Sequence, residues 1–238
     1  MRIWCVPDIH GRLDLLNPLL DKLYAEENLD LSVDKLLFLG DMIDRGSDSK
    51  GVLDKIRDLT LLHQHNVVAL AGNHEWLAID AHIRPSYDTE YIWHINGGVQ
   101  TLNSFQDPYT PGHTPKRMPD DYVRWMASLP LKHEESGFFF SHAPVPRENR
   151  RNIMYRGTKD FAKEELIWTY DNDEFGVARV HGPGIVGVCG HIHRLREGCL
   201  EPRFYDHYIF ADAGCGCSAR APLVAIEVKS RKVISAWP

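Results

Sequence analysis

The sequence lacks any apolar run near the roughly 20 residues that a membrane-spanning helix needs. Its first residues also lack the pattern of a secretory signal peptide, because the apolar stretch is short and Asp8 and His10 interrupt it. The formal net charge is −6, so the composition does not favour a generally basic surface for nucleic acid. We therefore expect a cytoplasmic protein with no membrane partner and no stable nucleic-acid partner.

Cysteine is scarce, and the five residues form an odd set that argues against a disulfide framework. Cys215 and Cys217 flank Gly216, and we interpret this segment as a tight turn rather than a metal clip. Internal repeats, low-complexity tracts and linkers are absent as well. The sequence therefore predicts a single domain over residues 1–238, long enough to bury a sizeable core.

The first third of the chain alternates between short apolar runs and helical spacing. Apolar runs at residues 3–6, 35–39 and 66–70 predict buried strands, because each is short and strongly apolar. Between them, hydrophobic residues recur about one helical turn apart over residues 13–24 and 49–62. This order predicts an α/β layered core with parallel pairing in its first half.

The rest of the chain divides into two parts. Residues 76–135 are rich in proline and contain short helical patches such as 121–128, which predicts a partly helical insertion beside the core. The tail is expected to form a mainly antiparallel sheet. Its predicted strands cover residues 137–141, 185–189, 208–211, 223–228 and 232–235.

Polar side chains follow the predicted strands where each strand ends. Because the carboxyl ends of strands in open α/β sheets line the binding crevice, these side chains are expected to converge. Carboxylate, amide and imidazole ligands, with one carboxylate shared, suit a pair of divalent cations. Each cluster alone is a weak signal, but their order along the chain favours one dinuclear site. The clusters are Asp8-Ile-His10, Gly-Asp41-Met-Ile-Asp44-Arg45-Gly, Gly-Asn73-His74-Glu75, His142 and Gly-His191-Ile-His193.

Taken together, these motifs resemble the calcineurin-like metallophosphoesterases, and within them the phosphoprotein-phosphatase branch. The motif order is similar to that of bacteriophage lambda-type Ser/Thr phosphatases and bacterial diadenosine tetraphosphatases. The resemblance covers residues 8–75, His142, His191, His193 and, more loosely, residues 210–214. It implies an α/β fold, a four-layer α/β/β/α sandwich of two mixed sheets with flanking helices.

The resemblance also implies a role for each residue that matches a motif. Two divalent ions are expected, most readily Mn²⁺, with Fe or Zn as alternatives. His74 would be the general acid, Asp44 would orient it, and Arg45 would hold a phosphate oxygen. Glu75 would either support the metal ligands from behind or act as a negative charge at a helix N-terminus. The implied metal ligands are Asp8, His10 and His193 for the first ion, Asp41 as the bridge, and Asn73, His142 and His191 for the second.

Two departures from the branch concern phosphate binding. Ala71 precedes the Gly-Asn-His-Glu segment where the branch places an arginine, and Thr169 and Tyr170 stand near another expected arginine. These departures weaken the case for a phosphorylated protein as the substrate. Four arginines follow His142, and they would either bind a nucleotide or polyphosphate chain or form a solvated loop. They are Arg147, Arg150, Arg151 and Arg156, of which the first three are our candidate substrate-binding residues.

The sequence thus predicts a metal-dependent phosphoesterase that hydrolyses phosphomonoesters with a metal-activated water. Its substrate partner would be a phosphorylated protein or a nucleotide. Hydrolysis of dinucleoside polyphosphates or other nucleotide anhydrides is the main alternative, and a cyclic phosphodiesterase also fits. A non-catalytic scaffold is disfavoured because the implied ligand set is complete. Trp76, Trp93, Trp125 and Trp168 are expected to pack in the core or walls rather than to stack on a base.

Overall fold

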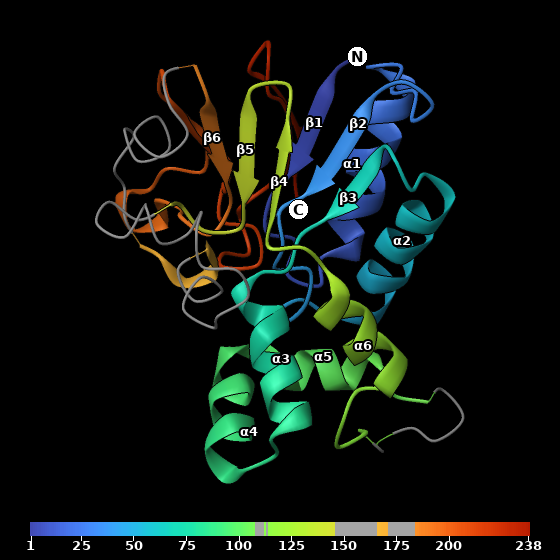
Figure 1. Ribbon diagram of the computed structural model, residues 1–238. Coiled ribbons are helices and arrows are strands. Elements are labelled where there is room, and N and C mark those ends of the chain that lie inside the picture. Colours follow the sequence, from blue (N-terminus) through green and yellow to red (C-terminus); the bar gives the residue numbers. More distant parts are fainter. Residues whose placement is uncertain (108–111, 113, 146–165, 171–183) are drawn as a thin grey trace.

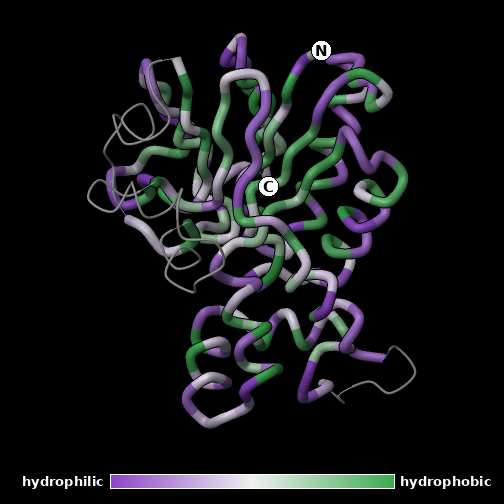
Figure 2. Tube along the Cα trace, in the orientation of Figure 1, coloured by the Kyte–Doolittle hydropathy of each residue, from purple (hydrophilic) through white to green (hydrophobic). Residues whose placement is uncertain are grey.

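The computed structural model describes residues 1–107, 112, 114–145, 166–170 and 184–238. Across these ranges, no helix combines the length and apolar character needed to cross a membrane. Hydrophobic residues concentrate along the strands, and hydrophilic residues dominate many of the connecting segments (Figure 2). The core therefore lies on and between sheets.

The first sheet has the strand order β10-β9-β1-β2-β3 within the described residues. Strands β1, β2 and β3 pair in parallel, as predicted. Strand β9 pairs antiparallel with β1, and β10 pairs antiparallel with β9. Helices α1 and α2 cover its outer face (Figure 1). The bounds are β1 (Ile3–Val6), α1 (Leu13–Ala25), β2 (Lys35–Phe38), α2 (Ser49–Leu62), β3 (Val67–Ala69), β9 (Leu223–Glu227) and β10 (Lys232–Ala236).

The second sheet has the order β4-β5-β6-β8-β7 within the described residues. The prediction of a mainly antiparallel tail is wrong, because β5, β6 and β8 pair in parallel and β9 and β10 join the first sheet. Strands β4 and β7 were not predicted. The bounds are β4 (Lys132–Glu135), β5 (Phe138–Ser141), β6 (Val186–Cys189), β7 (Arg203–Phe204) and β8 (Tyr208–Phe210), with a 3₁₀ turn η2 (Leu195–Glu197).

Alternation along the strands explains the layers, since successive side chains of a strand point to opposite faces. In β1, Ile3 and Cys5 belong to the cluster between the sheets, whereas Trp4 and Val6 belong to the cluster under the helices. In β5, Phe140 faces the first sheet, and Phe139 belongs to a third cluster on the other face. The predicted α/β fold of two mixed sheets with helices is confirmed.

A group of helices lies between β3 and β4 and forms a lobe below the sheets in Figure 1. The predicted insertion ends earlier than expected, because residues 132–135 form β4 and pair with β5. The single-domain organisation stays a prediction. The lobe contains α3 (Asn73–Ile83), α4 (Tyr87–Trp93), the π-helical turn η1 (His94–Gly98), α5 (Val99–Ser104) and α6 (Asp120–Ser128).

The carboxyl ends of β1, β2, β3 and β5 point toward this lobe in Figure 1. The chain leaves each of these strands within a few residues of one of the predicted polar clusters. The fold therefore gathers loops that are far apart in sequence at one edge of the two sheets, as parallel strands do in other α/β proteins.

Candidate metal centre

Asp41 lies at the centre of the gathered loops and is shared by two groups of potential metal ligands. One group is His10, Asp41 and His74, and the other is Asp41, His142 and His191. The ligand atoms of each group lie within 4.8 Å of one another. One carboxylate common to two clusters is the arrangement that a pair of cations requires.

The first group forms where β1 and β2 end. Nε2 of His10 lies 3.8 Å from Oδ2 of Asp8 and 3.7 Å from Oδ2 of Asp41. The other ring nitrogen, Nδ1, lies 3.0 Å from the carbonyl oxygen of Ile43. A proton on Nδ1 donates to that carbonyl and leaves the Nε2 lone pair directed at the carboxylates, as in metal-ligating histidines.

The second group forms where β2, β5 and β6 end, and Asn73 at the start of α3 lies beside it. Nδ1 of His142 lies 2.9 Å from the carbonyl oxygen of Leu39, while Nε2 lies 2.9 Å from Oδ1 of Asn73. Nε2 of His142 is also 3.4 Å from Oδ1 of Asp41. Nε2 of His191 is buried without a hydrogen-bond partner in the described structure. Because a buried polar atom normally has a partner, this orphan nitrogen fits a cation.

Burial and like charges make the site unfavourable without a cation. Burial, reinforced by Asp8, holds the pKa of Asp41 well above its ordinary range, although His74 opposes the shift. Burial lowers the pKa of His191 to about 2, with further lowering by His142 and His74. The pKa of His193 is lowered by burial as well. Neutral imidazoles beside crowded carboxylates form a donor set that suits divalent metals.

Backbone strain concentrates at these loops. Of eight non-glycine residues with positive φ among those described, five carry or adjoin this chemistry. Such strain persists only where the surroundings hold it in place, and it is common at functional sites. The five residues and their φ angles are His10 (49°), Asp41 (51°), Asp44 (73°), Arg45 (67°) and His191 (61°).

Two glycines permit the close approach of the carboxylates. A Cβ atom on Gly72 would lie 2.2 Å from Oδ1 of Asp41, and one on Gly190 would lie 2.3 Å from Oδ1 of Asp8. The second position is further fixed because the backbone amide of His191 donates to Oδ1 of Asp8 at 2.9 Å. Any side chain at Gly72 or Gly190 would therefore displace a predicted ligand.

Glu75 is a fully buried anchor for the loop that carries Asp41. Its carboxylate accepts hydrogen bonds from the backbone amides of Asp41 (2.9 Å), Met42 (2.8 Å) and Gly72 (2.8 Å). Glu75 lies in the first turn of α3, as one of the two alternatives expects. Its carboxylate holds the loop that carries Asp41 through these backbone donors, and a role around the metals stays a prediction.

His74 lies in a hydrogen-bonded network at the start of α3. Its Nδ1 lies 2.7 Å from Oδ2 of Asp44. Asp44 is buried and also accepts hydrogen bonds from Nε1 of Trp93 at 3.0 Å and Oγ1 of Thr101 at 2.6 Å. Burial opposes the charged imidazole, but Asp41 and Asp44 outweigh it, so the pKa of His74 is raised. This arrangement orients the ring and favours its protonated form.

The side chain of Arg45 extends across the site toward His10 and His74. Its Nη1 lies 2.8 Å from Nε2 of His10, and its Nη2 lies 2.9 Å from Nε2 of His74. Nη1 also donates to Sγ of Cys217. The guanidinium therefore occupies the space beside the ligand atoms, where it could pair with an anionic group.

A pocket opens over these side chains. Asp8, Asp41, Asn73, His191 and His193 line it together with Arg45 and His74, so the fold brings most of the predicted residues to one hollow. His193 belongs to neither ligand group, and its Nδ1 accepts a 3.4 Å hydrogen bond from the amide of Leu195. Asn96, Trp168, Tyr170 and Cys217 complete the lining. The candidate residues Arg147, Arg150 and Arg151, and the neighbouring Arg156, lie outside the described residues.

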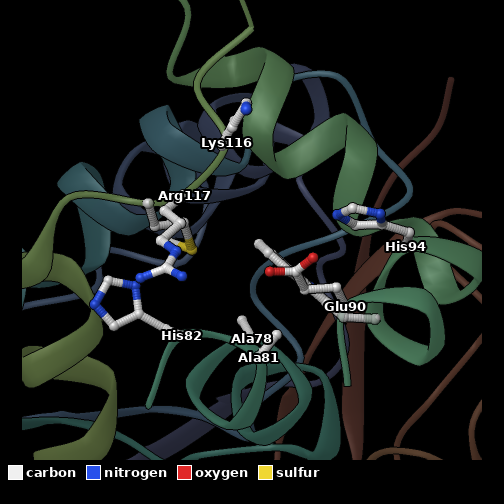
Figure 3. Close-up of a pocket in the computed structure, with 9 residues that line it drawn as sticks. Ala78, Ala81, His82, Glu90, His94, Lys116 and Arg117 are labelled. Atoms are coloured by element: carbon white, nitrogen blue, oxygen red, sulfur yellow. The ribbon is translucent and has the colours of Figure 1, made fainter. Parts of the chain in front are cut away.

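A second, smaller hollow lies within the helical lobe (Figure 3). Arg117 and His82 lie side by side on one side of this hollow (Figure 3). The carboxylate of Glu90 points toward them from the other side (Figure 3). Trp93 also lines this hollow and is the residue that donates to Asp44. None of its lining residues belongs to a ligand group, so the first pocket is the candidate active site.

Sequence reasoning missed several residues that shape this site. Trp93, Thr101 and Asn96 come from the helical lobe, whose internal register no strand-end motif predicts. The expectation that Trp93 packs inside is confirmed, since it is 4% exposed. Trp168 is 37% exposed and lines the pocket, a place in the wall that the same expectation allows. The only available signal for Trp93 and Thr101 was their place in the segment that follows His74.

The calcineurin-like phosphoesterase family model matches residues 1–195. The chain is 40% identical over 96 residues to serine/threonine-protein phosphatase 1 of Salmonella typhimurium, covering 40% of this chain and 38% of that protein. Identity to serine/threonine-protein phosphatase 2 of Escherichia coli is 30% over 177 residues, or 71% of this chain and 68% of that protein. The symmetrical bis(5'-nucleosyl)-tetraphosphatase of Xanthomonas axonopodis pv. citri is 37% identical over 75 residues, covering 32% and 21%.

Among solved structures, a protein serine/threonine phosphatase from Saccharomyces cerevisiae has a TM-score of 0.61 at 16% identity. The match covers 100% of this chain and 80% of that chain. This likeness concerns the fold. The sequence matches span only 38% of the first relative's length and 21% of the tetraphosphatase's.

Proposed function

The chain belongs to the calcineurin-like phosphoesterase family, and from that premise we propose that it hydrolyses phosphomonoesters with two divalent metal ions. The single observation that carries the proposal is Asp41, whose carboxylate is common to both ligand groups. A single-metal site would need no such sharing, and a non-catalytic scaffold would not need His74 in a polarised pair with Asp44.

The two ions would be held by the groups that meet at Asp41. Asp8, His10 and His193 would complete one position, and Asn73, His142 and His191 the other. Bound there, divalent metals supply Lewis acidity that makes water more acidic and withdraws charge from phosphoryl oxygens. The mixed oxygen and imidazole donors are compatible with Mn²⁺, which we propose as the native metal, with Fe and Zn as the alternatives.

The chain's own side chains supply the rest of the chemistry. Arg45 would bind a phosphoryl oxygen and so stabilise the charge that builds up during in-line displacement. His74 would donate a proton from Nε2 to the leaving oxygen, because its Nδ1 is held by Asp44 and its pKa is raised. On substrate binding, the guanidinium of Arg45 would have to exchange its contact with Nε2 of His74 for the phosphate.

Hydrolysis of dinucleoside polyphosphates remains the second candidate. Ala71 stands where the resemblance places an arginine that binds a monoester phosphate. Alanine carries no charge, and the side chain is buried at 1% exposure, so this position supplies no cation to the site. One relative is named a bis(5'-nucleosyl)-tetraphosphatase. The substrate would then be a nucleotide rather than a phosphorylated protein, and the reaction would take place in the cytoplasm in either case.

Metal-stripped protein, assayed with and without added Mn²⁺, separates these functions. A phosphoserine peptide and diadenosine tetraphosphate serve as the two substrates, at equal concentrations and pH. Mn²⁺-dependent release of phosphate from the peptide supports the phosphomonoesterase proposal. Cleavage of the dinucleotide alone transfers the function to nucleotide anhydrides, and Mn²⁺-independent or absent turnover of both contradicts the proposal.

A further inference from the structure

Two aromatic side chains stand at the mouth of the candidate active site. Trp168 is 37% exposed and Tyr170 is 68% exposed, yet both line the same pocket as Asp41 and His191. Large aromatic side chains normally bury most of their surface, so exposure of two of them beside a polar site is unusual. Neither has a place in the hydrolysis step described above.

Tyr170 is held against a predicted metal ligand. Its ring centroid lies 4.5 Å from that of His191, with the rings inclined by 48°. The His191 ring also contacts the His142 ring at 5.0 Å. Tyr170 therefore leans on a buried imidazole pair while most of its surface faces solvent and the pocket. Such support limits the freedom that an exposed tyrosine would lose on binding a ligand.

We infer that Tyr170 and Trp168 form an aromatic wall that selects substrates whose phosphate is joined to a nucleobase through a sugar. This inference rests on the proposed phosphoesterase function and specifies the substrate class of the same site. The wall would stack the base, since every base offers a π-face to an aromatic side chain. A phosphate bound beside His191 would place the rest of its ester next to Tyr170.

The position of the wall favours a nucleobase over a phosphotyrosine ring. In phosphotyrosine the ring is bonded directly to the ester oxygen, so it must enter the pocket beside the buried ligand atoms. A nucleobase is separated from the phosphate by a sugar and can reach a ring that is mostly exposed. Tyr170 is such a ring, at 68% exposure, whereas Asp41 and His142 are almost fully buried.

Binding to the Mn²⁺-loaded His74→Asn variant tests the wall, because its turnover should be about 10³-fold slower and little of either ligand is hydrolysed during a titration. Adenosine 5'-monophosphate and ribose 5-phosphate carry the same phosphate and sugar and differ only by the base. Titration calorimetry should give about tenfold tighter binding for the nucleotide, which is the usual order for base stacking. Tyr170→Leu should bring the two affinities close together, whereas Tyr170→Phe should preserve the difference because it keeps the ring.

Tyr87→Leu is the matched control, because Tyr87 is 80% exposed and lies on α4 outside the pocket. It should leave the affinity ratio unchanged. Equal affinities with Tyr170 in place, or a ratio that survives Tyr170→Leu, would overturn the inference. Tighter binding of phosphotyrosine than of phosphoserine, with no tighter binding of the nucleotide than of ribose 5-phosphate, would also overturn it. Base preference without hydrolysis of any phosphoester would instead count against the proposed function alone.

Discussion

The two ends of strand β2 carry buried charge in opposite ways. At the amino end, Asp34 accepts hydrogen bonds from the backbone amide of Arg2 at 2.8 Å and from its Nε at 3.0 Å. These bonds outweigh the effect of burial, and the pKa of Asp34 is lowered. Past the carboxyl end, burial and Asp8 raise the pKa of Asp41 well above its ordinary range.

This difference separates charge that stabilises the fold from charge that is held ready for a ligand. The amino end satisfies each carboxylate oxygen and lies in ordinary backbone. The carboxyl end combines positive φ angles, an orphan imidazole nitrogen at His191 and crowded carboxylates. Unsatisfied buried groups destabilise a protein unless something else binds them. The comparison therefore predicts that substitutions at the two ends have opposite effects on activity and stability.

Asp41→Asn should have the largest effect on activity. Loss of the shared carboxylate should lower kcat/KM by about 10⁴-fold, since metal chemistry contributes several kcal/mol to such reactions. The metal-free variant should melt at the same or a higher temperature than metal-free wild type, because one charge leaves the cluster with Asp8 and Glu75. Steady-state kinetics and calorimetric melting after chelation measure both quantities. A less stable metal-free variant would break the comparison.

His74→Asn should lower kcat by about 10³-fold, within the range for loss of a general acid. The value of kcat for p-nitrophenyl phosphate should fall much less than that for an alkyl phosphate. The leaving group of p-nitrophenyl phosphate is far better, and its oxygen needs no proton. Comparing the two substrates with wild type and variant measures this. Equal losses on both would argue that His74 acts chiefly as a ligand, as its place in the first group allows.

Trp93→Phe should lower kcat by about tenfold, because Asp44 loses one donor and holds His74 less firmly. Thr101 still donates to Asp44, so the effect should stay moderate. Trp4→Phe is the matched control, because Trp4 is 1% exposed and its Nε1 has no hydrogen-bond partner among the described residues. That control should change the melting temperature without changing kcat, and a similar fall in kcat would remove the proposed link.

Arg2→Leu should have the smallest effect, a loss of about 1 kcal/mol in the free energy of unfolding at pH 7, with kcat unchanged. The pKa of Asp34 is lowered in the fold from its ordinary 3.8. Its contribution is therefore complete above that value and is lost as pH falls through the folded pKa. Urea unfolding at pH 7 and at a series of pH values below 3.8 should show the two proteins converging as the pH falls. An undiminished difference would mean that Asp34 is not the partner that matters.

Sequence periodicity identified the strands that carry the chemistry. The apolar runs at 3–6, 35–39 and 66–70 correspond closely to β1, β2 and β3, and the helix predicted at 49–62 has the bounds of α2. The convergence of Asp41, His142 and His191 followed from their places at strand ends. Pairing direction in the second sheet did not, because period-two alternation is the same in parallel and antiparallel strands. Strand β4 was missed because Lys132–Glu135 is polar.

The supports of the site were less predictable than its ligands. Trp93 and Thr101 reach Asp44 from helices whose position depends on tertiary packing of the lobe. Glu75 was recognised, but which backbone amides it binds depended on the positive φ of Asp41. In each case the deciding contact joins segments that no local pattern connects.

The number of Mn²⁺ ions bound per chain shows whether Asp41 is shared by two metal positions. Chelated protein should be titrated with Mn²⁺ in a calorimeter, with wild type and Asp41→Asn side by side. We expect two ions per wild-type chain, fewer or much more weakly bound ions in the variant, and a rise in melting temperature as both wild-type positions fill. A wild-type chain that binds one ion or none, or a variant that still binds two with equal affinity, would contradict it.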